Sequence, residues 1–220
     1  MIKLSAFYKK KPQINSNMFR QWLLTHGNQF RQHPDLEGYR INFVNEVRTL
    51  NIDPTQMEYD ATSEQWFNSE DGAVLLHSLL TREEIMDIEL MCLSRTVFFT
   101  EEHVIVNEPS VSTNFKLVVL LQRRSDLSVD EWRDWWLNHA QLTAQIPGLR
   151  AYRINFITKV HNFELQNQGI NFDGTAQLWF DSFADMEFGF CSSIGMKASK
   201  DSDNHCDKRV RFLTEEYRVI

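Results

Sequence analysis

The chain has few cysteines, and they are widely spaced. Its 220 residues include three, Cys92, Cys191 and Cys206. The cysteines are odd in number, and their spacing is not that of a disulfide framework or a zinc site. We therefore expect reduced thiols and no metal centre, in a reducing, cytoplasmic location. The N-terminus carries its positive charges after its apolar part. That order does not fit a secretory signal peptide.

Long apolar runs and an excess of positive charge are also missing. No apolar stretch approaches the roughly 20 residues needed to cross a bilayer, so no membrane contact is expected. The formal net charge is −7, and no basic surface is concentrated in the sequence. Since binding to phosphates requires such a surface, nucleic acid is not expected as a partner.

Glycine is scarce, with eight residues, and none forms a phosphate-binding loop or a GxSxG elbow. We therefore expect no nucleotide and no dissociable cofactor. Aromatic residues, in contrast, are plentiful, with 16 Phe and 6 Trp. They are typical of a thick core or of a pocket for flat apolar molecules.

The first half of the sequence is repeated in the second. Residues 113 apart align without a gap from Lys3 to Phe43, and the segment YRINF occurs in both copies. This similarity predicts an internal duplication, with repeats at 1–107 and 115–220 and a linker between them. The identical pairs outside YRINF are Lys3/Lys116, Leu4/Leu117, Arg20/Arg133, Trp22/Trp135, Leu24/Leu137, His26/His139, Gln32/Gln145, Pro34/Pro147 and Leu36/Leu149.

Each repeat is expected to follow the order βαββαβ, which is ferredoxin-like. Asn15 or Ser16 caps the first helix of the first repeat, and Ser128 with Glu131 forms a capping box in the second, as Thr81 does with Glu84. Residues 45–70 and 197–208 are largely polar and are expected to be surface insertions. The expected strands are 2–8, 36–44, 73–80 and 98–107, then 115–122, 149–157, 175–181 and 211–220.

An antiparallel sheet covered by helices on one face leaves the other face open. Two such sheets in one chain can cover each other, which predicts an α+β fold with a closed or nearly closed eight-stranded barrel. The barrel would be an intramolecular pseudo-dimer, either as a monomer or within a higher homo-oligomer.

A histidine lies on the inner face of the first helix of each repeat. The positions i, i+3, i+4 and i+7 share one helical face, which should pack against the sheet. In the second repeat they are Trp132, Trp135, Trp136 and His139, and in the first Phe19, Trp22, Leu23 and His26.

Four segments of the second repeat resemble the EthD branch of the dimeric α+β barrel superfamily. They are the helix pattern WxxxHAxL, the strand IPGLRAYRIN, the strand DGTAQLWFDS and the late FLTEE. The resemblance is weaker in the first repeat, where DGAVLLHS places His77 at the position of Trp179. It implies a pocket between sheet and helices that holds a small, often aromatic or polyketide-derived molecule, without fixing the reaction.

His139 and His26 are the candidate catalytic bases. An imidazole titrates near pH 6.5, and partial burial keeps it neutral and able to accept a proton. Such a base suits the removal of an acidic C–H or O–H proton. The alternative is a packed histidine whose ring is satisfied by neighbouring groups.

Tyr152 and Tyr39, on the adjacent strands, are candidate donors to a developing enolate oxygen. The alternative is that both are core aromatics. Arg153 and Asn155 lie on the opposite strand face, as do their first-repeat counterparts Arg40 and Asn42. If the helices cover the tyrosine face, Arg and Asn join the two repeats. If they cover the other face, which the family-like RxN pattern favours, Asn155 and Asn42 lie near the histidines.

The remaining candidate substrate contacts are Trp135, Trp179 and His77. Trp135 shares the face of His139 but is equally suited to the core. Trp179 is either a pocket wall or packing between repeats, and His77 offers a second imidazole to pair with His26. The set Asp203, His205, Cys206 and Asp207 matches no standard zinc spacing.

The leading hypothesis is cofactor-independent proton transfer on a small hydrophobic metabolite, aromatic, polyketide-like or lactone-type. The reaction would be isomerisation, cyclisation, decarboxylation or oxidation by dioxygen, and the second repeat, with its fuller motif pattern, would hold the working site. The alternative is a non-catalytic small-molecule-binding or accessory protein of the same fold. A haem-binding barrel is a third possibility.

Overall fold

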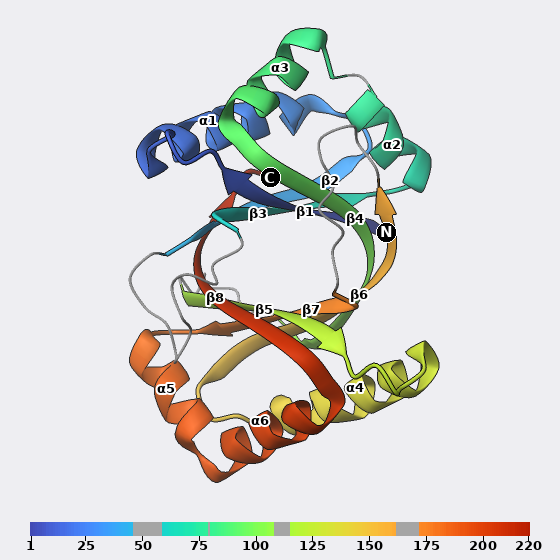
Figure 1. Ribbon diagram of the computed structural model, residues 1–220, viewed down its shortest axis with the longest axis vertical. Helices are drawn as coiled ribbons and strands as arrows, with labels where there is room; N and C mark the ends of the chain where they lie inside the picture. The colour runs from blue at the N-terminus through green and yellow to red at the C-terminus, as the bar shows by residue number, and fades with distance from the viewer. Residues whose placement is uncertain (46–58, 79, 108–114, 162–171) are drawn as a thin grey trace.

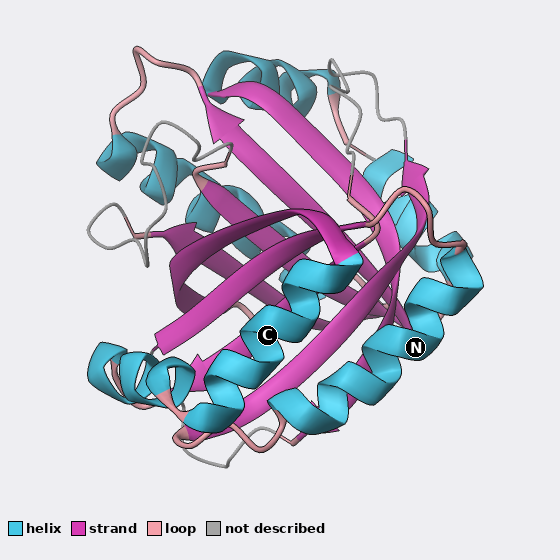
Figure 2. Ribbon diagram, turned by 60° about the horizontal axis from the view of Figure 1, so that its bottom comes forward, coloured by secondary structure: helices cyan, strands magenta, loops and turns pink. Residues whose placement is uncertain are grey.

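Eight antiparallel strands close into one barrel with helices around its outside (Figure 1; Figure 2). The computed structural model describes residues 1–45, 59–78, 80–107, 115–161 and 172–220. The predicted linker at 107–114 lies outside these residues except for its first. The strands are β1 (Ile2–Lys10), β2 (Leu36–Val44), β3 (Ala61–Phe67), β4 (Cys92–Val106), β5 (Phe115–Arg123), β6 (Leu149–His161), β7 (Gly174–Phe180) and β8 (Cys206–Arg218).

The helices of each half cover the outer face of that half's strands, at opposite ends of the view in Figure 1. Within the described ranges, the first half has three α-helices and one 3-10 helix, and the second half has three α-helices. They are α1 (Ser16–Gln29), η1 (Phe30–Gln32), α2 (Glu70–Ser78), α3 (Arg82–Met91), α4 (Val129–Thr143), α5 (Phe183–Cys191) and α6 (Ser193–His205).

The strand order shows how two four-stranded sheets make the barrel. The first half has the order β4-β1-β3-β2 and the second β8-β5-β7-β6, which is the ferredoxin-like order in both. Pairing of β2 with β8 and of β4 with β6 joins the sheets. Closure leaves no sheet edge unpaired, which confirms the predicted α+β barrel of two ferredoxin-like sheets.

The structural correspondence between residues 113 apart continues beyond Phe43, where the sequence alignment of the two halves ended. The third strand of the first half is Ala61–Phe67, and 113 residues on lies Gly174–Phe180, the third strand of the second half. The prediction of a strand at 73–80 is therefore wrong, because residues 70–78 form α2. The apolar run AVLLHSLL suits a buried helix as well as a strand. The polar ATSEQWF was mistaken for an insertion because its alternate side chains face a polar barrel interior.

The second predicted insertion, at 197–208, is also wrong, since it contains most of α6 and the start of β8. The buried face of α6 consists of Gly195, Ala198 and Ser202. These small residues lack the apolar periodicity by which a packed helix is normally recognised. The three predicted helix caps, in contrast, are confirmed: the Asn15 side chain caps α1, and capping boxes begin α3 and α4.

Substitution of Gly195 by alanine should destabilise the protein by about 1–3 kcal/mol. A Cβ at this position would lie 2.2 Å from the carbonyl oxygen of Gly189 and 2.6 Å from the Cα of Phe190, both backbone atoms that cannot move aside cheaply. Helix propensity alone would predict a gain of about 0.5–1 kcal/mol from the same change. Urea unfolding shows whether the free energy of unfolding falls or rises. Met196→Ala, at an exposed neighbouring position, serves as the control.

The buried apolar side chains form two helix–sheet cores and one cluster inside the barrel. Strand residues alternate between these environments, so that in β1 Leu4 and Tyr8 face the helices and Phe7 faces the barrel interior. Phe7, Phe98, Val118, Leu120, Phe172, Val210 and Phe212 fill part of the interior. Polar and charged side chains occupy the rest of it.

Candidate active site

His139 lies between α4 and α6, where it is 8 % exposed. Its Nδ1 is 2.7 Å from Oδ2 of Asp201 on α6. The same carboxylate oxygen accepts a hydrogen bond of 3.0 Å from Nε1 of Trp135. The Trp135 ring lies between the rings of His139, at 4.9 Å, and His205, at 4.4 Å. A carboxylate and an indole therefore hold the imidazole in one orientation.

The second ring nitrogen of His139 faces two hydroxyls. Its Nε2 is 3.0 Å from Oγ1 of Thr143 and 3.2 Å from Oγ of Ser202. Since Asp201 accepts from Nδ1–H, Nε2 carries the free electron pair in the neutral ring. Ser202 donates to the Ala198 carbonyl oxygen at 3.1 Å, so Thr143 is the donor to Nε2. Nε2 is thus the basic nitrogen.

The pKa of His139 is lowered from its ordinary value of 6.5, because burial disfavours the charged ring. The hydrogen bond and charge of Asp201 oppose the shift without cancelling it, and His205 and Arg209 add to it. The imidazole is therefore neutral at pH 7 and able to accept a proton.

A small cavity of about 50 Å³ adjoins His139 on the sheet side. Its lining includes Thr143 and Tyr152, and the Tyr152 hydroxyl group is fully buried, which raises its pKa above the ordinary value of 10. Side-chain hydrogen bonds to Trp136 and Thr143 partly oppose this shift. A water molecule occupies about 30 Å³, so the cavity holds one water or the end of a larger molecule. It does not enclose a whole aromatic metabolite.

The equivalent histidine of the first half has a different environment. His26 stacks on Trp22 at 5.5 Å and meets the edge of Phe30 at 5.0 Å. Burial, with the charge of Arg95, lowers its pKa to about 4, against a smaller opposing effect of Glu84. Within the described part of the chain, the structure gives His26 no hydrogen-bonding partner comparable to Asp201. The two halves therefore place one imidazole in a polar cluster and the other among aromatic rings.

The tyrosines lie on the helix side of their strands, and the asparagines face the barrel interior. Tyr39 and Tyr152 are 1 % exposed in the two helix–sheet cores. Asn155 accepts from Lys3 Nζ at 2.9 Å, and Asn42 donates to Glu64 at 3.2 Å. The favoured expectation that Asn42 and Asn155 lie near the histidines is therefore wrong. The RxN pattern belongs to the contact between the halves.

Trp179 does not line the histidine cavity either. Trp179 is 1 % exposed inside the barrel, with Lys116 Nζ 4.6 Å from its ring centre. Its counterpart 113 residues earlier is Trp66, not His77, because His77 lies in α2. His77 therefore does not lie on the strand where it was expected, and its pairing with His26 stays a prediction.

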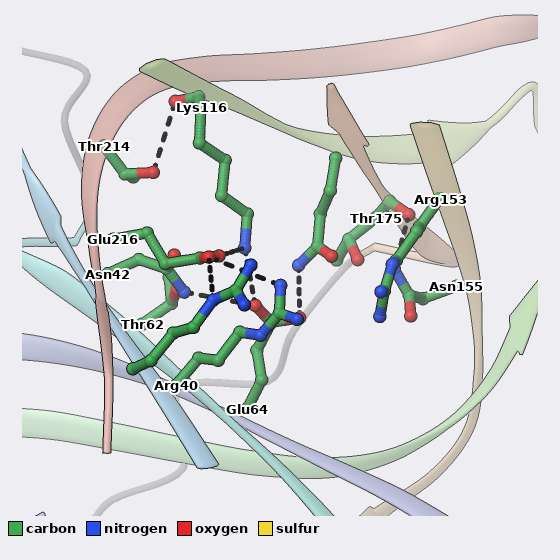
Figure 3. Close-up of polar contacts among 12 residues, drawn as sticks. Arg40, Asn42, Thr62, Glu64, Lys116, Arg153, Asn155, Thr175, Thr214 and Glu216 are labelled. Atoms are coloured by element: carbon green, nitrogen blue, oxygen red, sulfur yellow. Dashed lines mark hydrogen bonds and ion pairs between the residues drawn. The ribbon is translucent and has the colours of Figure 1, made fainter. Parts of the chain in front are cut away.

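The charged cluster inside the barrel was not foreseen. Glu64 lies at its centre, with Oε1 2.5 Å from Lys3 Nζ. Its Oε2 is 2.6 Å from Lys116 Nζ (Figure 3). Gln177, which is the counterpart of Glu64, donates to Glu64 Oε1 at 2.5 Å. The identity of Lys3 and Lys116 in the two repeats was the available signal, since each alternates with apolar residues in a strand. Glu102 pairs with Lys3 and Arg153, and Glu216 with Lys116 and Arg40.

Among the described residues, no three or more His, Cys, Asp and Glu side chains form a group suited to holding a metal ion. Two of the four residues with ligand-type side chains at 203–207 have other partners: Asp207 accepts from the Ser125 backbone N–H, and Asp203 pairs with Arg209. No described helix is long and apolar enough to cross a membrane.

A comparison with protein-family models matches residues 124–209 to the EthD domain. The match lies within the second half of the chain. Its limits include every residue of the His139 cluster, namely Trp135, His139, Thr143, Tyr152, Asp201 and Ser202. The match includes the helix pattern and the two strand motifs on which the resemblance was based, whereas the late FLTEE, Lys3 and Glu64 lie outside it.

Solved structures share the fold of the whole chain. An anthrone oxidase-like protein has a TM-score of 0.69 at 9 % identity, with 99 % of this chain and 92 % of that chain covered. A candidate monooxygenase from Fusobacterium nucleatum has 0.64 at 7 % identity, covering 98 % and 91 %. One from Lactobacillus acidophilus NCFM has 0.57 at 9 % identity, covering 100 % and 94 %. A comparison with curated proteins gives no match.

Proposed function

We propose that the protein is an enzyme that moves a proton on a small organic molecule at His139. The observation that carries the proposal is the hydrogen bond that Asp201 accepts from Nδ1 of a buried, neutral imidazole whose ring lines a cavity. This arrangement is that of a general base held in one tautomer by a carboxylate. The EthD domain and the enzyme names among the structural neighbours support small-molecule processing.

In the proposed reaction, Nε2 of His139 takes a proton from an acidic C–H or O–H group, and the carboxylate of Asp201 stabilises the resulting imidazolium. Thr143 connects Nε2 to the Tyr152 hydroxyl, so a proton can pass through the Thr143 hydroxyl. The cavity accepts only the reacting end of the substrate. Half-buried Arg211, which also lines it, provides a positive charge for the developing oxyanion.

The test is a proton-transfer assay on two simple probes. We expect the protein to accelerate the isomerisation of α-angelica lactone to its conjugated isomer, or deuterium exchange at the α-carbon of 2-tetralone. His139→Ala should lower kcat/KM by at least about 100-fold, the usual contribution of a positioned general base. Because the pKa of His139 lies below 6.5, the rate should persist below that pH and fall as the ring is protonated.

The control is His103→Gln, which removes an imidazole that pairs with Glu101 on β4, away from α6. Its rate should match that of the unsubstituted protein. A folded His139→Ala variant with full activity would refute the proposed role of His139.

One observation favours a second candidate function, non-catalytic small-molecule binding. Both ring nitrogens of His139 already have protein partners, and the adjoining cavity measures only about 50 Å³. A binding or accessory protein needs a cavity but no titrating base. Absence of acceleration with both probes, together with ligand binding that survives His139→Ala, would support this second function.

A further inference from the structure

His205 is the last residue of α6, and the proposed reaction gives it no role. The centre of its imidazole ring lies 4.4 Å from that of the Trp135 ring, with 10° between the two planes. Its Nδ1 is 2.8 Å from the backbone carbonyl oxygen of Asp201, one helical turn earlier. Because a carbonyl oxygen only accepts, Nδ1–H of His205 donates there, which fixes the plane of the ring. His205 is therefore held flat against the indole.

The Trp135 indole connects this ring to the proposed base. Its other aromatic neighbour is His139, whose ring centre lies 4.9 Å away. Nε1 of the indole donates to Oδ2 of Asp201 at 3.0 Å, and Nδ1 of His139 donates to the same oxygen at 2.7 Å. Two donors thus hold one carboxylate oxygen in place. If the indole moved, the oxygen would lose one of them, and its position opposite Nδ1 would be less well defined.

The end of α6 has a counterpart at the end of α3. Cys92, which follows α3, pairs with Lys10 of β1, and Cys206, which follows α6, pairs with Arg123 of β5. Lys10 and Arg123 are equivalent positions of the two repeats, 113 residues apart, so the helix ends are equivalent as well. The residue at the end of α3 is Met91. Its side chain has no ring to stack and no N–H group to donate.

The carboxylate at the equivalent position of the first half takes no part in its histidine site. Asp87 lies four residues before the end of α3, as Asp201 does in α6, and it is exposed. In the part of the chain that the structure describes, no hydrogen bond joins Asp87 to Trp22 or His26. An indole, an imidazole and a carboxylate at corresponding positions therefore do not assemble by themselves. The half in which they do assemble ends its helix with the imidazole of His205.

We propose that His205 is a positioning residue for the base. By stacking on Trp135, His205 keeps Nε1 of the indole on the carboxylate of Asp201. The carboxylate in turn keeps the proton of His139 on Nδ1 and leaves Nε2 free to accept another. His205 does not line the cavity, so it acts only through these two side chains. Its effect on rate rests on the proposed function, whereas its effect on the His139 ring is measurable without a substrate.

The test follows the nitrogen-15 signals of His139 in the labelled full chain at pH 7, because they distinguish the Nδ1–H from the Nε2–H tautomer. His205→Ala removes the stacked ring, and His205→Phe keeps a ring in its place. We expect the ratio of the Nδ1–H to the Nε2–H tautomer to fall at least about threefold in His205→Ala, since the hydrogen bond at the other nitrogen sets the tautomer. The ratio should stay within about twofold of the wild-type value in His205→Phe.

Asn204→Ala is the matched control, because Asn204 is the exposed neighbour of His205 on the same helix. It should leave the His139 signals unchanged, and urea unfolding checks that each variant is folded. An unchanged tautomer ratio in folded His205→Ala would overturn the proposal. An equal loss in His205→Phe and His205→Ala would also overturn it, because the stacked ring would then not be the cause.

The rate provides a second measurement. With α-angelica lactone, His205→Ala should lower kcat at least about threefold, the effect of a less well oriented base, and His205→Phe should restore it. An unchanged kcat in folded, active His205→Ala would count against the proposal. If the wild-type protein transfers no proton on either probe, the proposed function fails, and the nitrogen-15 signals still decide the role of His205.

Discussion

Replacement of Glu64 by leucine is expected to lower the free energy of unfolding by about 3–5 kcal/mol, the usual cost of removing one partner of a buried ion pair. Glu64 is 2 % exposed and contacts Lys3 and Lys116, which are 2 % and 0 % exposed. Without the carboxylate, two ammonium groups would remain in the barrel with less compensating charge. Urea unfolding at pH 7 measures the loss.

The triple variant Glu64→Leu/Lys3→Met/Lys116→Met is the control, because it removes all three charged side chains together. The remaining carboxylates, Glu102 and Glu216, keep Arg153 and Arg40 as partners. Replacing buried ion pairs by apolar residues is often neutral, so most of the lost stability should return. If the triple variant were as unstable as the single one, the loss of stability would come from the changed side-chain shape and not from the unpaired charge.

The effect of Glu64 also depends on pH in a defined direction. Burial alone would raise its pKa, but Lys116 and Lys3 outweigh burial and hold the pKa well below the ordinary 4.5. A carboxyl group with a depressed folded pKa contributes stability above its unfolded pKa and loses that contribution as the pH falls through the folded value. The difference between the wild-type protein and Glu64→Leu should therefore shrink below about pH 4.5.

The pair Glu64 and Gln177 is an arrangement that two unlike halves of one chain allow and that two identical subunits do not. The two residues are 113 positions apart and meet at the centre of the barrel. In a homodimer of identical subunits, both positions would hold the same residue. Two glutamates would repel each other or share a proton, and two glutamines would leave the lysines without a central counter-charge. One chain with two unlike halves can place one glutamate opposite one glutamine.

Protonation of His26 is expected to remove up to about 3 kcal/mol of stability as the pH falls from 6.5 to 4, since a shift of one pKa unit corresponds to about 1.4 kcal/mol. The folded pKa is about 4, lowered from 6.5 mainly by burial and further by Arg95. The unfolded chain thus binds the proton first. Stability is complete above pH 6.5, declines below it and levels off near pH 4.

The measurement compares urea unfolding of the wild-type protein and of His26→Phe between pH 4 and pH 7. The phenyl ring fits among Trp22 and Phe30 and does not titrate, so the difference between the two curves isolates His26. Proton NMR of the His26 ring gives an independent midpoint. A midpoint at or above 6.5 would contradict the expected burial effect.

The sequence by itself determined the duplication, the three helix caps, the α+β barrel and the inward direction of both helix histidines. These features depend on local patterns: the 113-residue repeat, capping residues at fixed spacing, and apolar residues at helical period. His26 and His139 are buried where that period places them.

Only the tertiary structure decided the position of β3, the existence of α6, the faces of Asn42 and Asn155, and the environment that makes His139 unlike His26. The physical reason is that polarity patterns indicate burial only when the interior is apolar, and the interior of this barrel is partly charged. Lys3 and Glu102 are 99 residues apart in the chain, and His139 and Asp201 are 62 apart. Such partners meet only when the barrel closes and α6 packs on α4.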